Sequence, residues 1–160
     1  MASATDFGVV ILNGIAYKET PQVFAIEIPM QTEGELLTNQ RLTLPGVANF
    51  LLKGLTRDFI DQFGQPTIRQ FRFRMNGTEG ATWFFSGGLG LLNDRVFDSL
   101  CFGSGQFPFP LVPPIPIQAA GSIIYEVEDA DSVDPVLGIF TPYTIAMAFH
   151  GTYLIPVSPT

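Results

Sequence analysis

The segment "RQFRFRMNG", Arg69 to Gly77, is the part of the chain that best defines the fold class. Apolar and polar side chains alternate along it, which places them on opposite faces of an extended strand. The apolar face consists of Phe71, Phe73 and Met75, and the polar face of Gln70, Arg72 and Arg74. Asn76-Gly77, a common turn signal, ends the alternation. The segment therefore predicts a β-strand with one face in a core.

Similar short segments, apolar or alternating and bounded by Gly, Pro or Asn, recur along the chain. They cover residues 7–12, 23–28, 41–44, 50–57, 81–85, 122–128 and 143–157. Asn13-Gly14 after the first of them predicts a hairpin. Helical spacing is limited to "DRVFDSLCF" (Asp94–Phe102), because the competing "GVANFLLKGL" suits a strand equally well. The pattern predicts an all-β, antiparallel sandwich or barrel with little helix.

The chain length suits one domain. With 160 residues the chain can bury a substantial core, but it is short for two such domains. Within that single domain we expect residues 41–160 to form the sandwich. We expect residues 1–40 to supply N-terminal strands or an arm that contacts a neighbouring copy. The polar stretch Pro29–Asn39 is expected to be an exposed connection.

Composition and charge restrict the partners. Only 14% of the residues are charged, and the net charge is −7, with no basic stripe to neutralise phosphates. We therefore expect no nucleic-acid partner. The N-terminus has no basic region and only a short apolar run, so we expect neither a signal peptide nor a membrane span, and synthesis in a cytoplasm. Low charge also suggests that a partner covers part of the surface.

Residue types that carry chemistry are few. His150, the single histidine, lies in an alternating strand, which favours a polar residue on an outward face over a base or metal ligand. Cys101, the single cysteine, favours a small buried thiol. "SGGLG" (Ser86–Gly90) has no following Lys and indicates a turn. We predict no catalytic residue, no metal site and no cofactor.

The cluster "EVEDADSVD" concentrates carboxylates within residues 126–134. Its spacing matches no calcium loop, so a solvated acidic turn is the favoured interpretation. A glycan site here would require an exposed tyrosine or Trp83 nearby.

Two features are candidate interfaces. Arg72 and Arg74 share the polar face of one strand and contact solvent, an acidic partner surface or neighbouring copies of the chain. The second feature is the run "FPFPLVPPIPI" (Phe107–Ile117), whose prolines fix an extended backbone with few N–H donors. Its apolar candidates for contact are Phe107, Phe109, Leu111 and Ile115. They fill pockets of a neighbour or close the protein's own core, and both interpretations remain open.

The order of these features resembles small β-sandwich structural proteins of tailed-bacteriophage virions. The similarity extends over roughly Thr43 to Leu154. It is carried by the succession of "FLLKGLTR", "FRFRMNGTEG", "FPFPLVPPIPIQAAGS", "IIYEVED" and "IAMAFHGTYL". It implies a jelly-roll-like sandwich, location in the virion and no enzymatic activity.

The resemblance implies first a capsid decoration or cement protein that contacts the major capsid protein or other virion proteins. Copies that tile a shell need self-contacts, so a homo-oligomer is expected. A neck, collar or baseplate component is the nearest alternative. A glycan-binding module for host attachment is a separate one, and a metal enzyme is disfavoured because His150 stands alone.

Overall fold

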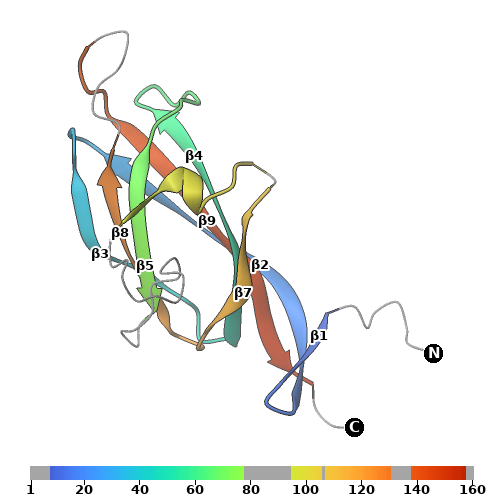
Figure 1. Ribbon diagram of the computed structural model, residues 1–160. Helices are drawn as coiled ribbons and strands as arrows, with labels where there is room; N and C mark the ends of the chain where they lie inside the picture. The colour runs from blue at the N-terminus through green and yellow to red at the C-terminus, as the bar shows by residue number, and fades with distance from the viewer. Residues whose placement is uncertain (1–7, 78–94, 106, 131–137, 158–160) are drawn as a thin grey trace.

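The computed structural model describes residues 8–77, 95–105, 107–130 and 138–157. The described chain is nearly all β, and two antiparallel sheets pack face to face as a sandwich (Figure 1). The first sheet has the order β1-β2-β9-β4-β7, with strands Val9–Leu12, Ile15–Met30, Tyr143–Pro156, Asn49–Asp61 and Phe109–Ile117. The second has the order β3-β8-β5-β6, with strands Leu36–Thr43, Ser122–Asp129, Phe71–Gly77 and Val96–Phe97. The prediction of an all-β antiparallel sandwich is confirmed.

Alternation decides which faces form the core. In β5 the residues Phe71, Phe73 and Met75 are fully buried, as their spacing predicts. In β9 the odd-numbered residues from Tyr143 to Phe149 are buried and the even-numbered ones are half-buried. Both strands therefore turn one apolar face inward.

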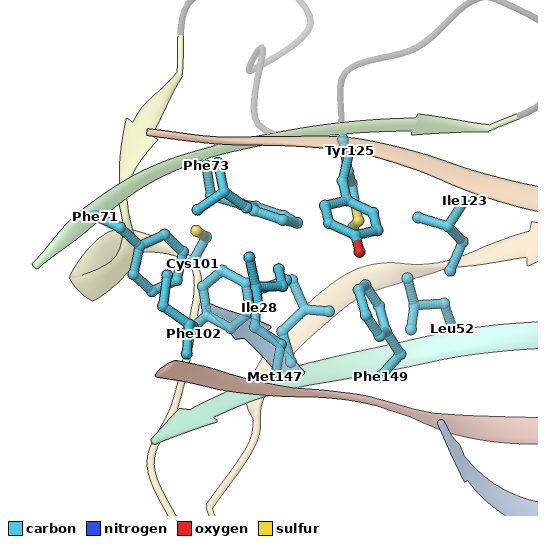
Figure 2. Packing of buried hydrophobic residues seen from close by; sticks show 14 of the residues in the cluster. Ile28, Leu52, Phe71, Phe73, Cys101, Phe102, Ile123, Tyr125, Met147 and Phe149 are labelled. Atoms are coloured by element: carbon cyan, nitrogen blue, oxygen red, sulfur yellow. The ribbon is translucent and has the colours of Figure 1, made fainter. Parts of the chain in front are cut away.

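Aromatic rings fill the space between the sheets. Phe73 and Tyr125 project from one sheet toward Phe149 and Leu52 of the other (Figure 2). The ring of Phe73 lies 4.8 Å from that of Phe102, measured between centroids, in an edge-to-face arrangement. Such pairs add specific attraction to the burial of their apolar surface.

Turns follow the residues that the sequence offers. Asn13 and Gly14 have φ of 51° and 79°, which a two-residue hairpin turn requires, and β1 and β2 pair across them. The predicted helical segment 94–102 is only a 3₁₀ turn, Asp98–Leu100, because the chain must re-enter the core at Cys101 and Phe102. Residues 78–94, which include Trp83 and Ser86–Gly90, lie outside the described part.

The predicted boundary at residue 40 does not separate two units. It falls inside β3, and β2 pairs with β9 from Tyr17 to Met30. Ile28 and Met30 belong to the buried core, so most of residues 15–40 is part of the sandwich. The exposed connection predicted for Pro29–Asn39 is confined to residues 31–35, since β3 begins at Leu36.

Candidate functional site

An arm projects from one end of the sandwich. It consists of β1 with residues 15–18 of β2 and residues 155–157 at the end of β9 (Figure 1). β2 and β9 have 16 and 14 residues, whereas β3, β8 and β5 of the facing sheet have 8, 8 and 7. Because the facing sheet is shorter, it cannot cover both strands along their whole length.

The edge of the covered region is marked by an aromatic cluster. Phe24, Phe50 and Tyr153 contact one another edge to face, with centroid distances of 5.2 to 6.2 Å. Beyond this cluster the inner face of the first sheet continues into the arm.

That continued face carries exposed apolar side chains. Register places Val9, Lys18 and Ile155 in one row and Ile11 beside Ala16 in the next, on the same face as the core residues of β2. The exposed fractions of Val9, Ile11, Ile155 and Val157 are 46%, 71%, 42% and 45%. Exposed apolar side chains gathered on one face are typical of interaction sites. These four residues define what we call the arm face.

The proline-rich run forms β7, an edge strand of the first sheet. Its prolines lack N–H donors, which is tolerated at an edge because no further strand needs them. Leu111 is buried and Ile115 is partly buried against the core. Phe107 is 81% exposed and Phe109 is 37% exposed. The four candidate residues of this run are therefore split between the core and the surface.

Arg72 and Arg74 lie in a ladder of ion pairs on the outer face of the second sheet. Arg74 makes two hydrogen bonds to Glu126, of 2.8 and 3.1 Å. Arg95 bridges Glu126 and Glu128 at 3.1 and 3.0 Å, and Arg72 lies 3.7 Å from Glu128. Burial alone would raise the pKa of Glu126, but hydrogen bonds from Arg74 and Arg95 outweigh it and lower that pKa.

The prediction of a solvated acidic turn is therefore wrong for the first part of the cluster. Cross-strand register brings Glu126 opposite Arg74 and Glu128 opposite Arg72, so these carboxylates are paired. Asp129 is buried and accepts hydrogen bonds from Tyr143 Oη at 2.6 Å and from the Gly34 N–H at 2.9 Å. Asp131 and Asp134 lie outside the described residues.

A buried ion pair fixes the 3₁₀ turn to β4. Arg57 Nε lies 2.5 Å from Asp98 Oδ2, and only 2% of the Asp98 side chain is exposed. Asp98 Oδ1 also accepts the Phe71 N–H at 3.3 Å. Cys101, three residues further on, is fully buried, and burial raises the pKa of its thiol. A protonated, inaccessible thiol is a poor nucleophile.

His150 lies on the outer face of the first sheet, half-buried, with Nε2 2.8 Å from the Thr56 hydroxyl. Burial lowers the pKa of His150. Since the folded pKa lies below the unfolded value of about 6.5, its contribution to stability is complete above that pH and is lost as the pH falls toward the folded pKa.

We expect the free energy of unfolding of the wild type to decrease between about pH 7 and pH 5. Replacing His150 by Gln should make this decrease smaller, because Gln keeps a hydrogen-bonding group and does not titrate. Denaturant titrations of both proteins at several pH values measure the difference. Equal pH dependence of the two proteins would contradict the prediction.

A shallow hollow of about 650 Å³ lies at the far end of β4. Its lining includes Arg57, Asp58, Arg69 and the apolar Ile60 and Ile68. Arg57 is engaged with Asp98, and Arg69 donates to the Thr141 hydroxyl and lies over the Tyr143 ring at 5.1 Å. Both arginines therefore have structural contacts of their own.

The described ranges contain no group of three or more His, Cys, Asp or Glu side chains that is placed to hold a metal ion. Within the same ranges, no helix has the length and apolar character needed to cross a membrane.

Comparison of the chain with protein-family models, with curated proteins and with solved structures found no match.

An N-terminal arm within residues 1–40 was predicted from the sequence, but the residues of the arm face were not. One signal was available, because the segment 143–157 is longer than the other predicted strands and a hairpin precedes its partner. Which residues would lie beyond the core depends on the length of the facing sheet, and local patterns do not contain that information.

Proposed function

We propose that the chain is a non-enzymatic structural protein of a bacteriophage particle, of the capsid-decoration or cement type. The observation that carries the proposal is the arm face, an extension of the core face on which exposed apolar side chains flank Lys18, with no cover among the described residues. A protein that holds to a particle surface needs such a contact. The resemblance in the order of sequence motifs supplies the bacteriophage context.

The strand order supports the proposal at the level of the fold. Apart from β1, strands β2 to β9 are ordered 2-9-4-7 in one sheet and 3-8-5-6 in the other. This order is compatible with a jelly roll, in which two Greek keys are wound together, and we propose that fold type. Jelly rolls serve as capsid and lectin domains, so the fold is compatible with both the shell and the glycan interpretations.

Copy number in purified virions tests the proposal. Quantitative mass spectrometry of particles from the system that encodes the chain should find hundreds of copies per particle for a shell decoration. About a dozen copies would assign it to the neck, collar or baseplate instead. Absence from particles would overturn the virion role, and a glycan-binding assay would then be the next experiment.

The arm face makes a prediction about binding. Replacing both Ile11 and Ile155 by Ser should abolish association with particles that lack the protein, because it removes apolar contact area. The fold should remain, since both side chains lie beyond the core. The matched control is Ile68→Ser, a side chain 93% exposed in the segment after β4, which should bind normally. Co-sedimentation with particles measures the difference, and equal binding of all three proteins would contradict the prediction.

A further inference from the structure

Within the described residues, one edge of the first sheet is open along β2. β9 pairs with β2 on one side as far as Met30, whereas β1 pairs on the other side only with Ile15–Lys18. Among the described residues, no strand lies beside Thr20–Met30 on that second side. Unpaired strand edges are templates for another strand, and proteins blunt them or use them.

The direction of the backbone groups along this edge follows from two hydrogen bonds. The Glu19 N–H donates to the Gly8 carbonyl at 2.6 Å on the β1 side, and the Ala16 carbonyl accepts the Val157 N–H at 2.9 Å on the β9 side. Since both backbone groups of a residue in an antiparallel strand point the same way, the odd-numbered residues face the open edge. Between residues 20 and 30 these are Pro21, Val23, Ala25, Glu27 and Pro29.

Two prolines lie on this edge at equal distances in sequence from Ala25. Pro21 and Pro29 each lie four residues from Ala25 and have no N–H to donate. Val23, Ala25 and Glu27 retain theirs, and Val23 is 48% exposed. The side-chain amide of Gln22 donates to the Val23 carbonyl at 3.2 Å, a contact that a neighbouring strand would replace.

We propose that β2 pairs with β2 of a second copy, antiparallel and about a two-fold axis at Ala25. In this register Ala25 faces Ala25, Val23 faces Glu27, and each proline faces a proline of the other copy. Every N–H at the edge then meets a carbonyl. The proline rings occupy the place of the N–H at residues 21 and 29, so the two strands separate there and the pairing is confined to Val23–Glu27. A register centred on Val23 instead places Ala25 opposite Pro21 and brings Glu27 to Glu19, whose N–H is already bonded.

The side chains suit the same register. On the inner face Phe24 comes opposite Ile26 of the second copy, and both are half-buried residues that pack against the core. Pairing would therefore extend the core across the two-fold axis. The segment between the two prolines is symmetric about Ala25, so an identical strand can pair along its whole length in an isologous contact, which favours a second copy over an unrelated peptide.

This inference gives the self-contact that the proposed shell role requires, but the dimer rests on β2 alone and uses no residue of the arm face. Cross-linking of the free protein tests the dimer, and co-sedimentation with particles tests the proposed shell role. A negative result in one experiment therefore does not imply a negative result in the other.

Engineered cysteines test the register in the full chain. In a hydrogen-bonded antiparallel pair the two Cα atoms lie about 5.5 Å apart, within the range that a disulfide spans. Under mild oxidation, Ala25→Cys should therefore form a covalent dimer on a non-reducing gel. Val23→Cys alone and Glu27→Cys alone should not, because each cysteine is about 14 Å or more along the strands from its own copy. A mixture of these two variants should cross-link. Cys101 does not compete, since it is fully buried.

A second measurement separates the outcomes. Sedimentation equilibrium should show a dimer for the wild type and a monomer for Ala25→Pro, a change at an edge position like those of Pro21 and Pro29, which should leave the fold intact. Cross-linking of all single variants alike, a wild-type protein that remains monomeric, or an Ala25→Pro dimer would overturn the proposal. Protection of the Val23 and Ala25 amides from exchange in the monomer would also overturn it, because the chain itself would then cover the edge.

Discussion

Replacing Asp98 by Ala is expected to lower the free energy of unfolding by about 3–5 kcal/mol, because it leaves a largely buried guanidinium without its partner. Arg57 is 19% exposed, so water compensates the lost charge only in part. The Phe71 N–H loses its acceptor as well. Denaturant titration measures the change.

Two variants make this prediction specific. Asp98→Asn keeps an oxygen for the Phe71 N–H but removes the charge, so its effect should lie between wild type and Asp98→Ala. Lys53→Ala breaks an ion pair of 2.7 Å with Glu19 in which the lysine and glutamate side chains are 39% and 14% exposed, and Glu19 keeps its hydrogen bond from the Thr152 hydroxyl. Exposed pairs contribute up to about 1 kcal/mol, so this control should change stability little. A similar loss for Lys53→Ala and Asp98→Ala would contradict the importance assigned to burial.

Replacing Phe73 by Ala is expected to cost about 3–5 kcal/mol, the range found when large buried aromatic residues are truncated. The ring is fully buried between the sheets and contacts Phe71, Phe102 and Tyr125 (Figure 2). Truncation leaves a cavity, and the aromatic rings around it belong to three different segments of the chain. Thermal and denaturant unfolding both measure the loss.

The control for Phe73 is Phe63→Ala. Phe63 is 79% exposed in the turn after β4, so removing it should change the free energy of unfolding by less than about 0.5 kcal/mol. If the two variants unfolded alike, the core position of Phe73 would be in doubt.

The strands that could be predicted from sequence are those with one buried face. In β5 and β9 the strict alternation of apolar and polar residues predicted directly which side chains are buried. Asn13-Gly14 predicted the hairpin, since few residues tolerate the positive φ values of its turn. The segment 94–102 was predicted less well. Spacing there suits a helix, but the Arg57–Asp98 pair and the burial of Cys101 end the turn at Leu100.

The candidate site was predicted only in part. Arg72 and Arg74 were placed correctly on the outer face of a strand, but their partners Glu126 and Glu128 are about fifty residues away in the chain. The spacing of residues in the sequence does not show which residues of two strands lie opposite each other, so the acidic cluster was interpreted as a solvated turn. Leu111 and Ile115 could not be separated from Phe107 and Phe109, because the prolines make all four equally extended.

The sequence by itself determined the all-β class, the hairpin at Asn13-Gly14 and the small number of N–H donors along β7, since these depend on properties of single residues and their neighbours. Only the tertiary structure decided that β2 and β9 are longer than the strands of the facing sheet and that Glu126 pairs with Arg74. It also decided that no described strand pairs with the edge of β2 between Pro21 and Pro29. Each of these depends on which strands become neighbours, and long-range packing of the two sheets sets that choice.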